Sequence, residues 1–149
     1  MREYDSRAAA YATAVFGEPQ TRDNLHSWYV LLNAEHLDKF EVPASYAAQL
    51  PWEDSYGAQG YNCEDIAALY QAGVHAGWAK TFHDALLDSR GRIEKSLRLH
   101  IDEMAYPIAA YLAGIEPGYA AKCALRRLSI EDTRRLHASV ASEYLDGVL

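Results

Sequence analysis

The chain has 149 residues, of which 21 are acidic and 14 are basic, so its formal net charge is −7. Half of the residues are hydrophobic and 23% are charged, with nine glycines and five prolines. This composition excludes collagen-like, low-complexity and strongly disordered chains, because it supplies enough apolar surface for a core. A chain of this length is typical of one domain, so we expect a single domain over residues 1–149.

The N-terminus and the cysteines indicate a reducing compartment. Residues 1–5 carry acidic side chains where a secretory signal needs a basic and then an apolar segment, and no long apolar run follows. We therefore expect a cytoplasmic protein without a membrane partner. Cys63 and Cys123 lie outside any Cys-x-x-Cys pattern, which predicts reduced, packed thiols and neither a disulfide nor a zinc site.

The residue usage predicts an all-α chain. Alanine occurs 25 times, whereas the β-branched residues valine and isoleucine together occur 12 times, and alanine favours helices most. A first helix is expected from Asp5 to Phe16, because Gly17 and Pro19 follow it as stop signals.

A second helix is expected to start at residues 21–24 and to end before Val42, since a residue that precedes proline avoids the α region. The stretch from Trp28 to Leu32 is also compatible with a strand. A short helix should then run from Pro43 to Leu50, with Pro51 as its stop.

Two long helices are expected in the middle of the chain. The first runs from Asn62, a good N-cap, to Leu87, and its Gly73 and Gly77 would let another helix approach closely. The second runs from Arg92 to Ala113 and should bend at Pro107. We expect these helices to form a central antiparallel pair joined at residues 89–91.

The C-terminal part should form two more helices. One runs from Tyr119 to Leu128, and the last starts at a capping sequence, residues 129–132, and reaches about Leu145. The expected fold is therefore a compact all-α bundle of five or six helices in one domain, with one irregular acidic and aromatic loop at residues 52–62.

The negative charge is concentrated in the first half. Residues 1–75 contain 11 acidic and 4 basic side chains, whereas the remainder contains 10 of each. The segment from Glu35 to Asp65 holds seven acidic residues against Lys39, together with the amphipathic rings of Tyr46, Trp52, Tyr56 and Tyr61. Aromatic side chains at a charged surface often anchor interfaces, and a field of one sign accelerates the encounter with a partner of opposite charge.

These features predict a non-enzymatic acidic binding protein without a cofactor. Its partner would be a basic protein from a nucleic-acid-processing complex, because carboxylates can occupy a Lys/Arg site that holds phosphates. An anti-CRISPR, antirestriction or immunity-type inhibitor of a phage or mobile element, acting as a nucleic-acid mimic, would fit this size and charge. The negative charge of both molecules disfavours direct binding to a nucleic acid. The sequence is compatible with a homodimer. The expected partner-binding residues are Glu35, Asp38, Glu41, Trp52, Glu53, Asp54, Tyr56, Tyr61, Glu64 and Asp65.

A basic cluster near the C-terminus offers an alternative, a small nucleic-acid-binding regulator. The spacing of the cluster also permits ordinary helix pairs, because Glu131 lies four residues from both Arg127 and Arg135, and Asp132 lies three from Arg135. The cluster consists of Lys122, Arg126, Arg127, Arg134 and Arg135.

A second alternative is a small metal-dependent hydrolase that uses His75, His83 and Asp84. The adjacent His83 and Asp84 pair resembles the pair of HD-type phosphohydrolases, which also need a further histidine and a distant aspartate. Eight residues of helix would leave His75 and His83 about 80° apart and two turns removed, which is poor metal-ligand spacing. No phosphate-binding glycine loop or nucleophile elbow is present, so no catalytic residue is assigned.

Overall fold

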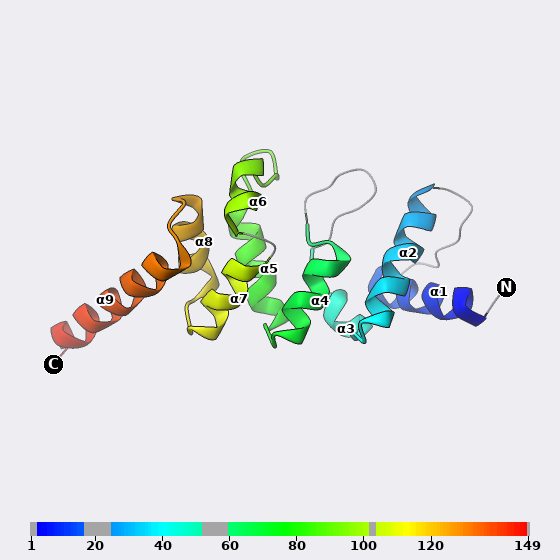
Figure 1. Cartoon of the computed structure of the whole chain (residues 1–149), viewed down its shortest axis with the longest axis horizontal. Helices are drawn as coiled ribbons and strands as arrows, with labels where there is room; N and C mark the ends of the chain where they lie inside the picture. The colour runs from blue at the N-terminus through cyan, green and yellow to red at the C-terminus, as the bar shows by residue number, and fades with distance from the viewer. Residues whose placement is uncertain (1–2, 17–24, 52–59, 102–103, 149) are drawn as a thin grey trace. The chain divides into compact units, whose positions relative to one another are not determined.

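The computed structural model describes residues 3–16, 25–51, 60–101 and 104–148. Over these ranges the chain forms nine helices and no strand, which confirms the all-α prediction (Figure 1). The chain divides into two compact units, Met1–Lys80 and Thr81–Leu149, which we call the N-terminal and C-terminal units. Both the helix count and this division differ from the expected single bundle of five or six helices. Within the described ranges, none of the helices has the length and apolar character needed to cross a bilayer.

The N-terminal unit contains helices α1 to α4 and the start of α5. Helix α1 packs against α2 and α3, and α2 also packs against α4. Its core includes Leu37, Ile66, Leu69 and Val74, each no more than 2% exposed. The stretch from residue 28 to 32 is helical, which settles its ambiguity. The helix bounds are α1 Glu3–Phe16, α2 Leu25–Lys39, α3 Ala44–Ala47, α4 Cys63–Gln71 and α5 Ala76–Leu86.

The expected helix from Asn62 to Leu87 is divided into α4 and α5. Gly73 has φ of +79°, and its N–H donates to Tyr70 O while the Val74 N–H donates to Leu69 O, both at 3.0 Å. This Schellman arrangement ends α4, with the buried Val74 as its apolar contact. Gly73 is therefore a helix terminator, and no atom of the described residues lies within 4 Å of where its Cβ would be. The close-packing role that we expected for this glycine is wrong.

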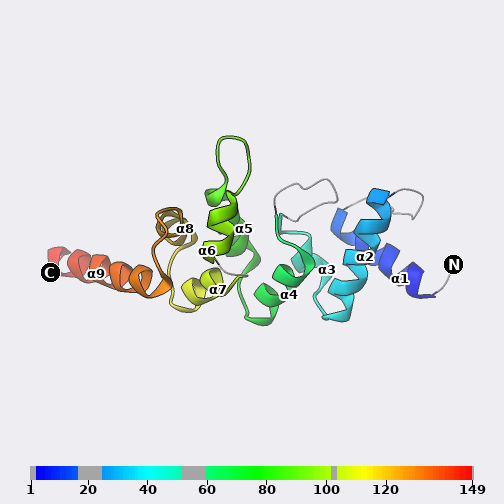
Figure 2. The ribbon, with the colours of Figure 1, turned by 45° about the horizontal axis from the view of Figure 1, so that its top comes forward.

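The C-terminal unit begins inside α5 and contains α6 to α9 (Figure 2). Helix α6 packs against α7 and α8, and α7 also packs against α8 and α9. The ring of Tyr106 stacks on Phe82 at 6.4 Å between centroids, and its hydroxyl lies 2.6 Å from Thr133 Oγ1 in the buried core. The helix bounds are α6 Lys95–Ile101, α7 Ala105–Leu112, α8 Pro117–Leu125 and α9 Ile130–Val148.

The expected helix from Arg92 to Ala113 is also two helices, so the predicted central antiparallel pair does not form. Met104 has φ of 74° and precedes α7, which breaks the helical path. Pro107 is the third residue of α7. In a first turn the backbone N–H has no partner within the helix, so proline is tolerated there and does not bend an established helix.

The helix starts predicted from capping residues are confirmed. Asn62 Oδ1 accepts from Asp65 N at 2.8 Å, and Asp65 Oδ2 accepts from Asn62 N at 3.2 Å, which completes a capping box for α4. Ser129 Oγ accepts from Asp132 N at 3.1 Å at the start of α9. These local signals succeed because each depends on side chains only three residues apart.

Candidate functional site

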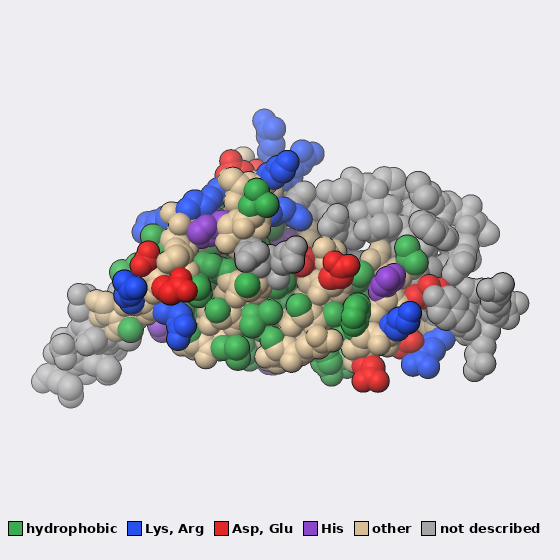
Figure 3. All heavy atoms as spheres, in the orientation of Figure 1, with side chains coloured by type: hydrophobic (Ala, Val, Ile, Leu, Met, Phe, Trp, Pro, Cys, Tyr) green, Lys and Arg blue, Asp and Glu red, His purple; other side chains and the backbone are tan. Residues whose placement is uncertain are grey.

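The expected binding residues all lie in the N-terminal unit, and the structure describes six of them. Trp52, Glu53, Asp54 and Tyr56 lie outside the described residues. On the face drawn in Figure 3, the acidic side chains of this unit form separate groups and not one continuous patch. The position of each described residue therefore decides whether its charge is available to a partner. The six are Glu35, Asp38, Glu41, Tyr61, Glu64 and Asp65.

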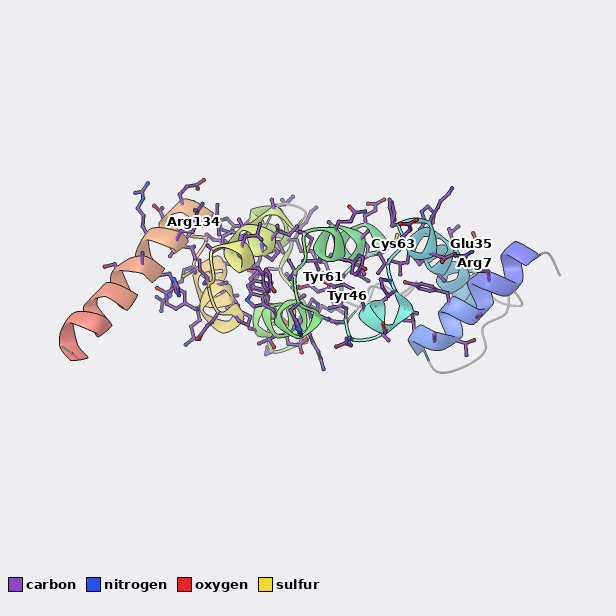
Figure 4. All side chains as sticks on the ribbon, turned by 90° about the horizontal axis from the view of Figure 1, so that it is seen from below. Arg7, Glu35, Tyr46, Tyr61, Cys63 and Arg134 are labelled. Atoms are coloured by element: carbon purple, nitrogen blue, oxygen red, sulfur yellow. The ribbon has the colours of Figure 1, made fainter. Side chains whose placement is uncertain are left out.

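Two of the acidic residues lie beside a cation of α1. Arg7 Nε lies 2.6 Å from Asp38 Oδ2, and Arg7 Nη2 donates to Asp38 Oδ1 at 3.1 Å. Glu35 is partly buried on α2, and Figure 4 shows it near Arg7, where α1 and α2 pack. The segment charge of −6 counted only Lys39 as a cation, because the sequence does not reveal that α1 brings Arg7 to this place.

Asp65 and Tyr61 serve the fold. Asp65 is part of the α4 capping box, where its carboxylate accepts a backbone N–H. Tyr61 is only 3% exposed, and its hydroxyl donates to Ala79 O at 2.7 Å. Tyr61 is thus a core residue, which departs from the expectation that it contributes to an exposed surface. The neighbouring aromatic residue Tyr46 donates its hydroxyl to Val74 O at 2.6 Å (Figure 4).

Glu41 and Glu64 are the remaining carboxylates, and both are exposed. Neither forms a salt bridge with any residue that the structure describes. Glu64 is the second residue of α4, where a negative charge complements the helix dipole. Burial raises the pKa of the adjacent Cys63 thiol, and the Glu64 carboxylate raises it further, so this cysteine is not an activated nucleophile.

Glu41 occupies an unusual backbone position. Its φ is 60°, its N–H donates to Asp38 O at 3.0 Å, and the Val42 N–H donates to Leu37 O at 3.0 Å. This is the Schellman arrangement that also ends α4 and α7, where Gly73 and Gly114 stand at the left-handed position. The left-handed conformation costs a residue with a Cβ roughly 1–2 kcal/mol, so glycine would be more stable here.

Phe40, which precedes Glu41, was not expected at a surface. It is 42% exposed, and it lies at the end of the segment that the sequence predicts as the second helix. Its N–H still donates to His36 O at 3.1 Å, so Phe40 is the C-cap of α2 and the chain leaves the helical path at Glu41. We call Phe40 and Glu41 the α2 corner, an exposed ring beside an exposed carboxylate. No glycine stands at position 41, so the sequence does not reveal the left-handed turn there.

The metal-site alternative gains no geometric support. His75 is exposed and precedes α5, His83 is buried within α5, and Asp84 is exposed. His83 Nδ1 lies 3.1 Å from Asp84 Oδ1, which is a pair and not a ligand set. In the part of the chain covered by the structure, no group of three or more His, Cys, Asp or Glu residues could hold a metal ion.

The C-terminal basic cluster is divided among different environments. Arg127 Nη2 contacts Glu94 Oε2 and Ser96 Oγ, both at 2.9 Å, and not the expected partner Glu131. Arg135 lies 3.8 Å from Asp132, the three-residue pair that the spacing predicted. Because Arg127 and Arg135 each lie beside an acidic side chain, the five cations of the cluster are not equally available to a nucleic acid.

Comparison of the chain with protein-family models, with curated proteins and with solved structures finds no match.

Proposed function

We propose that the chain is a non-enzymatic binding protein whose N-terminal unit directs carboxylates at a basic site of a protein that handles nucleic acid. The observation that carries this proposal is Glu41. It is an exposed carboxylate at a backbone position that favours glycine, and it has no salt bridge to any described residue.

A comparison with Arg127 strengthens the argument. Arg127 also ends its helix with positive φ, at 59°, but its guanidinium binds Glu94 and Ser96, so internal contacts offset the backbone cost. Glu41 lacks such an offset within the described residues. Strained positions cluster at functional sites, because contacts outside the isolated chain can favour the residue that strain disfavours. An external partner is such a contact.

The kind of partner follows from the chemistry of the α2 corner. An exposed carboxylate pairs best with arginine or lysine, and an adjacent exposed ring can pack on the guanidinium plane or on the methylene stem. Lys/Arg sites of this kind are typical of proteins that hold phosphate backbones. Glu64 on α4 and the carboxylates of Glu53 and Asp54 in the sequence add charge of the same sign.

The test is affinity capture with variants of matched position. Tagged wild-type chain is incubated with nuclease-treated lysate, and retained proteins are identified by mass spectrometry. Support requires a retained basic, nucleic-acid-binding protein that Glu41→Gly and Glu64→Gln together release and that added nucleic acid displaces. The control is Glu131→Gln, because Glu131 is the second residue of α9 just as Glu64 is the second residue of α4.

Glu41→Gly also separates binding from folding. Removing the Cβ at φ of 60° should raise the free energy of unfolding by up to about 1 kcal/mol, while the captured partner is lost. Urea denaturation followed by tryptophan fluorescence measures the stability. If the glycine variant retains the same partner in the same amount as wild type, the α2 corner is not the binding site.

A further inference from the structure

The C-terminal unit presents a group of exposed cations that the proposed function does not use. They come from the connection between α5 and α6, from the first residue of α6, and from α8. We call this group the basic face. It consists of Arg90, Arg92, Lys95, Lys122 and Arg126, all of them exposed.

The connection between α5 and α6 holds its arginines on a well-defined turn. Asp88 Oδ1 accepts from Arg90 N at 2.8 Å and from Arg92 N at 3.1 Å. The backbone closes the same turn, since Asp88 N donates to Arg92 O at 2.8 Å and Gly91 N donates to Asp88 O at 3.0 Å. Gly91 has φ of +72°, which glycine adopts readily.

The turn therefore offers side-chain charge and not backbone donors. The N–H groups of Arg90, Gly91 and Arg92 are all bonded internally, so they do not form the nest of amides that binds a single phosphate. The backbone hydrogen bonds to Asp88 lower the pKa of its carboxyl. This carboxylate is thus committed to the turn, and neither guanidinium group forms a salt bridge with a residue that the structure describes.

Side-chain contacts place the end of α8 beside α6. Arg127 reaches Glu94 and Ser96 at 2.9 Å, and the ring of His100 donates from Nε2 to Leu128 O at 2.7 Å. Lys95 lies between Glu94 and Ser96 in the chain, and Arg126 directly precedes Arg127. Figure 3 shows Lys and Arg side chains gathered over the α5–α6 connection and near the end of α8.

The acidic residues Asp88 and Glu94 are already engaged, whereas the cations of the basic face have no salt bridge within the described residues. Asp88 serves the turn and Glu94 binds Arg127. By contrast, no side chain of the basic face forms a salt bridge with another residue of the described ranges. Charges more than about 10 Å away are largely screened at 0.1 M salt, so the acidity of the whole chain does not cancel this local field.

From this arrangement we infer that the basic face binds the phosphodiester backbone of a nucleic acid. Cations spread over the α5–α6 connection, the start of α6 and the end of α8 match an extended polyanion, in which phosphates recur along a line. The internal bonding of the Arg90, Gly91 and Arg92 N–H groups argues against recognition of one small phosphate by a nest of these amides. This inference departs from the expectation of no direct nucleic-acid contact. The basic face shares Lys122 and Arg126 with the C-terminal cluster, but it adds Arg90, Arg92 and Lys95 and does not use Arg134 or Arg135.

The experiment measures fluorescence anisotropy of a labelled oligonucleotide, single-stranded and duplex, with the full chain across a series of salt concentrations. Affinity should fall steeply with salt, with a logarithmic slope of about 0.9 for each phosphate contacted on duplex DNA. Arg90→Gln with Arg92→Gln should reduce this slope by about 2 and weaken binding by about ten- to a hundredfold at 0.1 M salt.

The matched control is Arg134→Gln with Arg135→Gln, two adjacent exposed arginines of the same unit that line a hollow beside Ala113 and Ile115. It should bind like wild type. Lys122→Gln with Arg126→Gln is a second test of the face and does not touch the turn. Circular dichroism verifies that each variant is folded.

Four results would overturn the inference. They are no anisotropy change at about 50 mM salt, an equal loss in the control variant, equal competition by polyglutamate, and salt-sensitive self-association that accounts for the signal. Polyglutamate competition would indicate an acidic protein as the occupant, and self-association would indicate a second copy of the chain.

Discussion

Helix α2 of the N-terminal unit ends with Glu41 at positive φ, and helix α8 of the C-terminal unit ends in the same way with Arg127. The two positions share a hydrogen-bond pattern but differ in what the side chain contacts. Arg127 binds Glu94 and Ser96, whereas Glu41 stands exposed. The same helix-ending turn therefore carries a side chain with internal contacts in the C-terminal unit and an exposed side chain without a salt bridge to a described residue in the N-terminal unit.

The two units also differ in the sign of the exposed side chains that have no salt bridge to another described residue. In the N-terminal unit Arg7 binds Asp38, so one of the few cations of this unit is paired with an acidic residue. In the C-terminal unit Asp88 and Glu94 are engaged, and the arginines and lysines of the basic face are left. The charge that a partner meets is therefore what remains after internal pairing, and a count along the sequence does not measure it.

Substitutions in the core of each unit should have the largest effect on stability, and they test the division into two units. Leu69→Ala in α4 and Leu97→Ala in α6 each remove a buried side chain, which should cost about 2–5 kcal/mol of unfolding free energy. All three tryptophans, at positions 28, 52 and 78, belong to the N-terminal unit. Leu69→Ala should therefore shift the tryptophan transition, and Leu97→Ala should shift only the circular dichroism transition. One coincident shift for both variants would show that the chain unfolds as a single cooperative domain.

The helix caps provide a smaller, matched comparison between the units. Asn62→Ala removes the cap of α4, and Ser129→Ala removes the cap of α9. Each should cost about 1 kcal/mol, within a range of about 0.5–2 kcal/mol. Urea titrations with the same two probes assign each loss to its unit. Equal stability of wild type and Asn62→Ala would contradict a stabilising role for the capping box.

The C-terminal unit should lose stability as the pH falls below about 6.5, the ordinary pKa of histidine. Burial lowers the pKa of His83, and Arg98 lowers it further, although the hydrogen bond to Asp84 acts in the opposite direction. Below this pH the unfolded chain takes up a proton that the folded chain resists, so the unfolded state is favoured.

Urea midpoints from circular dichroism at about pH 7.5 and about pH 5.5 test this pH dependence. His83→Gln should reduce the difference between the two midpoints. His137→Gln, a partly buried histidine on α9, is the control. A pH response that His83→Gln leaves unchanged would assign the effect to other groups.

Breaking the exposed ion pairs should have the smallest effect on stability, at most about 1 kcal/mol. It also tests whether the charge that remains after internal pairing determines what each unit binds. Arg7→Gln exposes the charge of Asp38, so it should increase capture of a basic partner by the N-terminal unit. Glu94→Gln releases Arg127, so it should strengthen oligonucleotide binding by the C-terminal unit. Affinity capture and anisotropy measure the two results, and a change in the opposite direction would refute the role of residual charge.

Local sequence signals predicted much of the fold. The Asn62 and Ser129 caps lie where expected, and α1 and α2 end close to their predicted bounds. The predictions were wrong where apolar spacing continued across a helix break. At Gly73 and Met104 the chain turns to positive φ between segments of similar periodicity, so two long helices became four short ones.

The candidate site was harder to predict because its charges depend on partners distant in the chain. Asp38 lies 31 residues from Arg7, and Tyr61 lies 18 residues from Ala79. No periodicity encodes such contacts.

By itself the sequence determined the helical class, the capped helix starts and the location of excess acid, because these follow from side chains within a few residues of one another. Only the tertiary structure decided which carboxylates are engaged and which stay exposed. It also brought the end of α8 beside the start of α6, where Arg127 meets Glu94. The physical reason is that pairing and burial depend on distances in space, which packing sets between segments that the chain keeps far apart.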